Sequence, residues 1–219
     1  MSDVYYSRGT VTVDGTPFRV KAIGKGAFTR AYVTTGTKTP RVLLFTREDD
    51  AGDYSKLVLA EMNQDGNANS FIPKVKRVGF APNDTTVYEM PLYDTPLTKR
   101  KSPQAWAQYR VLKQCWDDAE TAMRTRFGEK AHSPYNGHWQ MAHVVECARK
   151  NKLITKALHT ALSRLQAYVA DYGSDYSFEF APRNLAVSPS GRLILLDTTF
   201  SRLALQRQRA AARRKYRGY

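Results

Sequence analysis

The sequence is poor in the residues that build metal sites and membrane spans. Its 219 residues include two cysteines, Cys115 and Cys147, and four histidines whose spacing matches no metal-binding pattern. Two cysteines outside any zinc motif predict free thiols and a cytoplasmic protein. No hydrophobic run approaches the roughly 18 residues that a membrane span requires. The N-terminal residues lack the apolar segment of a secretion signal, so we expect neither export nor a membrane partner.

Acidic residues are also scarce relative to basic ones. The chain has 34 lysines and arginines against 20 aspartates and glutamates, which gives a formal net charge of +14. Half of this excess lies after position 201, where seven basic residues occur without one acid. They are Arg202, Arg207, Arg209, Arg213, Arg214, Lys215 and Arg217. Such an imbalance favours an acidic partner, for example nucleic acid, a nucleotide or an acidic protein surface.

The pattern of apolar and turn-forming residues predicts two structural parts. Strands are expected at 11–20, broken by an Asp14-Gly15 turn, at 30–35, 41–46, 74–80 and 85–90, with one helix at 52–63. Helices are expected at 102–126, 139–149 and 152–171, and the last has the clearest apolar face. We therefore predict a β-rich N-terminal lobe over 1–90, a helical C-terminal lobe over 91–200 and a basic tail over 201–219.

The residues that could carry chemistry gather in two stretches. Near the C-terminus, Glu179 is followed by Asn184, by a turn at 188–191 and by Asp197 at the end of an apolar strand. This order would set three oxygen-bearing side chains around one pocket. Near the N-terminus, residues 24–33 read GKGAFTRAYV. Its glycines allow the backbone to bend closely over phosphate groups, where a Cβ atom would clash.

In this order the two stretches resemble those of protein kinases, and more narrowly those of the early protein kinases of autographivirus-type bacteriophages, which act during host takeover. The resemblance covers about residues 20–215 and is specific at 24–33 and 178–200. It implies an α+β, minimal two-lobed protein-kinase-like fold without the usual late helices of the C-terminal lobe. It also implies ATP and Mg²⁺ as cofactors and phosphate transfer to serine or threonine residues of host proteins.

The resemblance assigns a role to each matching residue. Glu179 takes the position of the catalytic acid, while Asn184 and Asp197 take the positions that hold Mg²⁺. The nucleotide contacts fall on Gly24, Lys25, Gly26, Phe28, Val33, Leu44, Glu89 and Met90.

Three departures from the kinase pattern bear on activity. Leu44 stands where kinases have the phosphate-binding lysine, and leucine cannot neutralise phosphate charge. Glu61 would be the helix glutamate that pairs with this lysine, or alternatively part of a solvated helix face. Glu179 stands in place of an aspartate, which moves the carboxylate by one methylene. The candidates for a substitute cation are Lys21, Lys25 and Arg47.

Three functions follow from these observations. The first is a phage-type serine/threonine protein kinase, and the second is a catalytically impaired pseudokinase that binds and inhibits a host protein. The third is a basic nucleic-acid-binding protein. The partner-binding residues of the tail would be Arg207, Arg209, Arg213, Arg214, Lys215 and Arg217, unless the tail is only a solvated helix end. We expect its first turns to dock on the C-terminal lobe.

Overall fold

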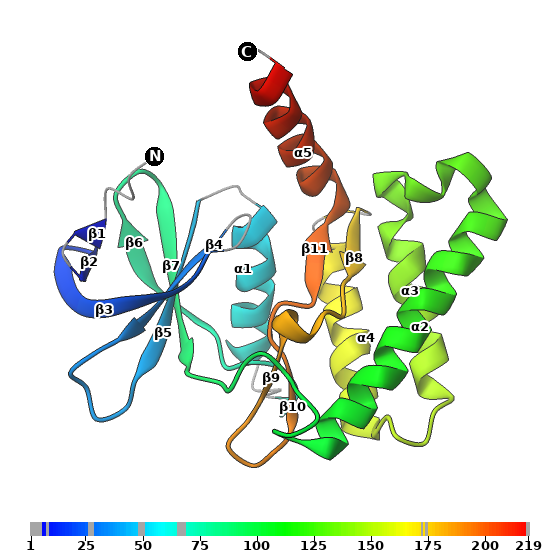
Figure 1. Cartoon of the computed structure of the whole chain (residues 1–219), viewed down its shortest axis with the longest axis horizontal. Coiled ribbons are helices and arrows are strands. Elements are labelled where there is room, and N and C mark those ends of the chain that lie inside the picture. Colours follow the sequence, from blue (N-terminus) through cyan, green and yellow to red (C-terminus); the bar gives the residue numbers. More distant parts are fainter. Residues whose placement is uncertain are drawn as a thin grey trace. The chain divides into compact units, whose positions relative to one another are not determined.

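The computed structural model describes residues 6–7, 9–25, 29–47, 51–64, 69–171, 173 and 175–217 (Figure 1). The chain forms two compact units, Met1–Tyr93 and Asp94–Tyr219. No helix among the described residues is long and apolar enough to cross a membrane.

Unit 1 is an antiparallel sheet with one helix. The sheet has the strand order β1-β2-β3-β4-β5-β7-β6. Its strands are β1 (Tyr6–Ser7), β2 (Thr10–Val13), β3 (Thr16–Lys25), β4 (Thr29–Thr34), β5 (Arg41–Arg47), β6 (Lys76–Ala81) and β7 (Thr85–Pro91), and the helix is α1 (Ala51–Gln64). The predicted turn between β2 and β3 is present. Asp14 and Gly15 have φ of 46° and 77°, the left-handed conformation that a tight hairpin requires.

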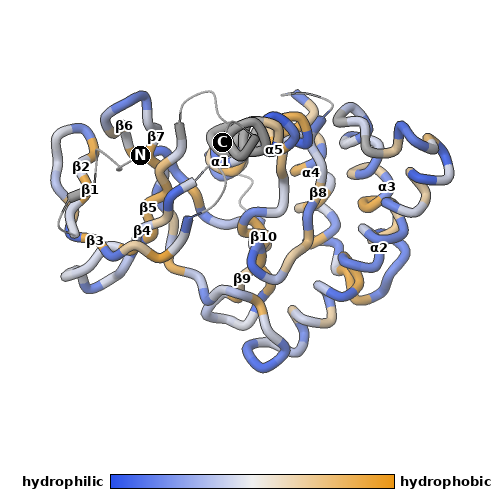
Figure 2. The backbone as a smooth tube through the Cα atoms, turned by 45° about the horizontal axis from the view of Figure 1, so that its top comes forward, coloured by the Kyte–Doolittle hydropathy of each residue, from blue (hydrophilic) through white to orange (hydrophobic). Residues whose placement is uncertain are grey.

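The sheet curls because its first hairpin returns to its last strand. The Asp14 amide donates to the Phe80 carbonyl at 2.8 Å, and the Phe80 amide donates to Asp14 Oδ1 at 2.9 Å. Gly79, with φ of 149°, makes this approach possible, since a Cβ atom there would lie 2.0 Å from Asp14 Oδ2. A cluster of buried side chains fills one face of the curled sheet: Val11, Val13, Val20, Tyr32, Leu43, Phe45, Ala81 and Val87. Figure 2 colours the chain by residue hydropathy and shows hydrophobic residues along β5 and β7 within this unit.

Unit 2 is mainly helical. Its helices are α2 (Pro103–Phe127), η1 (Gly128–His132), η2 (Pro134–Asn136), α3 (Gly137–Arg149), α4 (Lys156–Ala170), η3 (Pro182–Asn184) and α5 (Arg202–Arg217). Its strands are β8 (Tyr176–Phe178), β9 (Leu185–Val187), β10 (Leu193–Leu195) and β11 (Thr199–Ser201). They form two short antiparallel pairs, β9 with β10 and β8 with β11.

Side-chain caps set the starts of two helices. Ser102 caps α2 as expected, since its hydroxyl accepts from the Ala105 amide at 3.1 Å. The helix expected from residue 152 begins only at Lys156. Thr155 caps α4 by accepting from the Leu158 amide at 3.2 Å, and Leu153 lies before the helix with 53% of its surface exposed.

The predicted fold class is confirmed. Unit 1 is β-rich with one helix, and unit 2 is mainly helical, giving an α+β chain. After β11, only α5 follows among the described residues.

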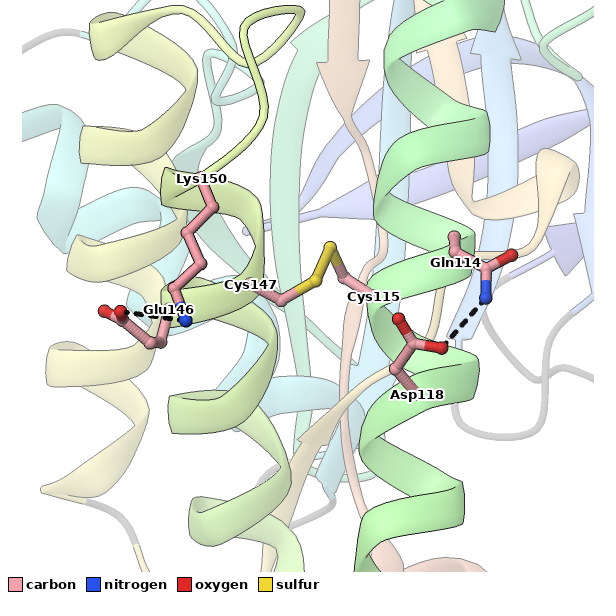
Figure 3. Close-up of a disulfide and its surroundings, with 6 residues drawn as sticks. All are labelled: Gln114, Cys115, Asp118, Glu146, Cys147 and Lys150. Atoms are coloured by element: carbon pink, nitrogen blue, oxygen red, sulfur yellow. Dashed lines mark hydrogen bonds and ion pairs between the residues drawn. A yellow bond between two sulfur atoms is a disulfide. The ribbon is translucent and has the colours of Figure 1, made fainter.

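The prediction of free thiols is wrong. Cys115 of α2 and Cys147 of α3 form a disulfide, with their Cα atoms 5.6 Å apart (Figure 3). The two helices pack side by side, and this packing brings together cysteines 32 positions apart in the sequence. Sequence spacing alone carries no sign of such a pairing. The disulfide also removes the basis on which a cytoplasmic location was expected, because disulfides are rare in that compartment.

Candidate functional site

Main-chain hydrogen bonds hold the loop that carries the predicted catalytic and metal-binding residues. The Glu179 amide donates to the Thr198 carbonyl at 2.8 Å, which ties the start of the loop to the segment after β10. The Asn184 carbonyl accepts from the Leu196 and Asp197 amides at 3.1 and 3.0 Å. These bonds bring three residues from both ends of a 19-residue stretch (179–197) next to one another.

The side chains of this loop also contact one another. Asn184 Nδ2 donates to Glu179 Oε2 at 3.2 Å, and the Arg183 guanidinium contacts Glu179 Oε1 at 2.7 Å. Within the described part of the chain, Asn184 Oδ1 accepts no hydrogen bond. The Asn184 amide therefore contacts the Glu179 carboxylate through its nitrogen, and its oxygen is the atom that could serve as a metal ligand.

A buried amide braces the strand that leads into the loop. Gln140 of α3 is 0% exposed and bonds both main-chain groups of Phe178, accepting from its amide at 3.1 Å and donating to its carbonyl at 3.2 Å. Trp116 Nε1 of α2 donates to the same carbonyl at 2.8 Å. Sequence reasoning missed Gln140. The signal was present, since a glutamine on the apolar face of a helix needs a buried partner.

The oxygen ligands of this loop fit a nucleotide-bound Mg²⁺ better than a metal site built wholly by protein. Among the described residues, no group of three or more His, Cys, Asp or Glu side chains is placed to hold a metal ion. Mg²⁺ commonly takes one or two protein oxygens and fills its other positions with water and substrate phosphates. Asn184 Oδ1 and the carboxylate of Asp197, an exposed residue, are the two oxygen ligands that the sequence analysis predicts for this loop.

In unit 1, strand register divides the predicted nucleotide-binding residues between two faces. Residues directly opposite each other in antiparallel strands share a face, and successive residues alternate. Val42 pairs with Val33 and with Met90, and Leu44 is two residues further along β5, so Val33, Leu44 and Met90 share one face. Glu89 pairs with Leu43 on the other face, where it forms an ion pair with Lys76 at 3.3 Å.

The glycine-rich stretch is described only in part. Gly24 and Lys25 end β3 and are exposed, after a register shift between Ala22 and Gly24. Gly26 and Phe28 lie outside the described residues, as does the side chain of Arg47.

A buried lysine is the second residue that sequence reasoning missed. Leu44 is 5% exposed, so the strand position of the kinase lysine is apolar and packed. Lys56 of α1 is 3% exposed, and full burial is rare for lysine side chains. Helix α1 packs against β5, which carries Leu44. The sequence shows a basic residue within the predicted helix 52–63. It does not show that this residue is buried.

The basic tail forms α5, and its first turn docks as expected. Arg202 reaches Glu120 of α2 at 2.6 Å and Ser177 of β8 at 2.7 Å. Arg207 and Arg209 are exposed. The side chains of the four remaining basic residues, Arg213, Arg214, Lys215 and Arg217, lie outside the described part of the structure.

Comparison with known proteins finds kinase-like structures but no sequence family. No protein-family model and no curated protein matches the sequence. Over 93% of its length the chain is similar to 53% of the BubR1 kinase domain, with a TM-score of 0.38 and 13% identity. It is similar over 91% of its length to 54% of vaccinia related kinase 3 (TM-score 0.39, 11% identity). It is similar over 83% of its length to 68% of a thermostable mutant of aminoglycoside phosphotransferase APH(4)-Ia (TM-score 0.39, 15% identity).

Its structural neighbours are therefore protein kinases and aminoglycoside phosphotransferases. The chain spans about half the length of the two kinase chains.

Proposed function

We propose that the protein is a phosphotransferase that uses a Mg²⁺-bound nucleotide. Unit 2 supplies the catalytic carboxylate of Glu179 and the metal ligands Asn184 and Asp197. In unit 1, the sheet face that carries Val33, Leu44 and Met90 supplies an apolar surface for the nucleotide base. Residues 24–28 supply the loop that covers the phosphates. The acceptor we propose is a serine or threonine hydroxyl of a host protein, in keeping with the resemblance to phage protein kinases.

The single observation that carries this proposal is the mutual placement of Glu179, Asn184 and Asp197. A phosphotransfer site needs a carboxylate for the acceptor hydroxyl and oxygen ligands for Mg²⁺, held in fixed relation. Here the side-chain amide of Asn184 donates to the Glu179 carboxylate. The main-chain carbonyl of Asn184 accepts from the Asp197 amide at 3.0 Å. Bound Mg²⁺ would neutralise charge on the phosphate oxygens, and Glu179 would accept the proton of the acceptor hydroxyl.

For the missing phosphate-binding cation we propose Lys56. Leu44 leaves no charge at its strand position, and the side chain of Lys56 is held in the interior of the same unit. An ammonium held there in low dielectric would attract phosphate strongly without having to be ordered first.

The proposal is tested with the Asp197→Ala variant. Mg²⁺-dependent stabilisation by ATP in thermal unfolding should be lost, and transfer from radiolabelled ATP should fall by about a hundredfold or more. The matched control is Asp171→Ala, which removes an exposed aspartate at the end of α4. Unchanged nucleotide stabilisation and transfer in the Asp197 variant would contradict the site.

A second candidate is a pseudokinase that binds nucleotide or a host protein without transferring phosphate. The buried Leu44 favours it, because this position offers no cation to the phosphates. Lys56→Met distinguishes the two. Loss of transfer supports a kinase with a displaced lysine. Absence of transfer in the unaltered protein, with nucleotide binding retained, supports the pseudokinase.

A further inference from the structure

Unit 2 has a groove that the proposed function does not use. It is lined mainly by residues of α2 and by residues 147–153, at and after the end of α3, and has a volume of about 680 Å³. Trp106, Val111 and Leu153 are apolar parts of its lining, which also includes the disulfide-bonded Cys115 and Cys147. Figure 3 shows the two cysteines pointing toward each other from the neighbouring helices.

The groove presents an apolar surface that is open to solvent. Leu153 is 53% exposed, one of few large hydrophobic side chains among the described residues with so much exposed surface. Its main chain is fixed from both sides, because its amide donates to Asn151 Oδ1 at 3.0 Å and its carbonyl accepts from Gln108 at 3.2 Å. A leucine that is held in an exposed position and lines a groove favours contact with a second apolar group.

The charges on the lining are mainly positive. Lys99 and Arg110 are exposed and form no ion pair within the described part of the chain. Lys150 also lines the groove and lies 3.5 Å from Glu146 (Figure 3). The hydrogen bond from Arg149 lowers the pKa of Glu146. The one carboxylate of the lining, Asp118, accepts from Gln114 at 2.9 Å (Figure 3).

We propose that this groove binds an acidic peptide segment of a protein partner, with an aliphatic side chain of the segment seated against Trp106 and Leu153. Lys99 and Arg110 of the lining would complement carboxylates of the same segment. Nucleic acid fits less well, because it carries no aliphatic side chain to seat against Trp106 and Leu153. The groove would recruit a partner whether or not the protein transfers phosphate.

The test uses the full chain in buffer without reductant, so that the disulfide stays intact. The probe is a short fluorescein-labelled peptide in which two leucines are flanked by aspartates and glutamates, and its binding is followed by fluorescence anisotropy. Lys99→Glu together with Arg110→Glu should weaken binding about tenfold or more and reduce its salt dependence. The matched control, Arg124→Glu with Lys130→Glu, reverses two exposed charges beyond the groove and should leave binding unchanged.

A second pair of variants tests the apolar contact separately. Leu153→Ser should weaken peptide binding several-fold, whereas Leu92→Ser, at a leucine 49% exposed in unit 1, should not. Melting temperatures check that each variant is folded. Equal loss in the control variants, no effect of either groove variant, or tighter binding of a labelled DNA strand than of the peptide would each overturn the proposal. Loss of phosphate transfer in Asp197→Ala with peptide binding retained would separate the groove from the proposed catalytic function.

Discussion

The two units position their candidate functional residues by different means. In unit 2, hydrogen bonds fix the loop from Glu179 to Asp197, and Gln140 and Trp116 bind the strand before it. In unit 1 the positions follow from the alternation of side chains along a strand. This alternation places Leu44 on one face of the sheet and Leu43 on the other. A hydrogen-bonded loop depends on a few particular contacts, whereas a sheet face depends on the whole pattern of alternation. The two sites should therefore respond differently to substitution.

The largest effect on stability is expected for Gln140→Leu. This change removes two hydrogen bonds and leaves the Phe178 amide buried without a partner, so unfolding free energy should fall by about 2 to 4 kcal/mol. Urea unfolding measures it. Gln104→Leu, at an exposed glutamine of the same type on α2, is the control and should change little. Equal stability of the two variants would show that the brace is unimportant.

A comparison of Leu44→Lys with Leu43→Lys tests which face of the unit 1 sheet binds the nucleotide. Both leucines are buried, at 5% and 1% exposure, so either lysine should destabilise the protein by a few kcal/mol. Mg-ATP should restore stability only to Leu44→Lys, since only that lysine shares a face with Val33 and Met90. Thermal unfolding with and without Mg-ATP measures this. Rescue of both variants, or of neither, would contradict the assigned nucleotide face.

Removing the N-cap side chains of α4 and α2 should lower the stability of the protein less, and by different amounts. Thr155→Ala should cost about 1 kcal/mol, as for a typical N-cap. Ser102→Ala should cost more, because the Ser102 hydroxyl also donates to the Gly191 carbonyl at 2.7 Å and so joins the start of α2 to the β9–β10 turn. Thermal unfolding of both variants provides the comparison. Equal losses would mean that the contact with the turn adds nothing.

The smallest effect on stability is expected for deletion of residues 207–219. The docked Arg202 remains, so the melting temperature should stay nearly unchanged. Binding to a short fluorescein-labelled DNA duplex should weaken, and its salt dependence should decrease, because fewer cations displace counterions. If affinity and salt dependence match those of the full chain, the tail does not bind nucleic acid.

What could be predicted from the sequence was local. The Asp14-Gly15 turn and the Ser102 cap depend on residues next to one another, and both are confirmed. Strand β11 escaped prediction because three residues carry little periodicity, and it forms only by pairing with β8. The disulfide and the Gln140 brace escaped for a related reason, since each depends on which helices become neighbours.

For the candidate site, the sequence supplied the residues of the loop but not the means of holding it. The spacing of Glu179, Asn184 and Asp197 could be recognised from the sequence because it resembles the order of these residue types in kinases. The cation that replaces the missing lysine at position 44 could not be identified from the sequence. Lys21, Lys25 and Arg47 were the candidates because a cation from a neighbouring strand could reach the same oxygens, whereas burial draws attention to Lys56.

The main-chain anchoring of the unit 2 loop has a consequence for how its chemistry can change. The bonds that shape the loop come from the backbone of Glu179, Asn184 and Asp197, and any residue other than proline retains those donors and acceptors. Loop architecture and side-chain chemistry are therefore separable by mutation. A lineage could exchange aspartate for glutamate at position 179, or lose and regain transfer, without refolding the loop. On such a scaffold, a single substitution would be enough to turn an active enzyme into an inactive binding protein.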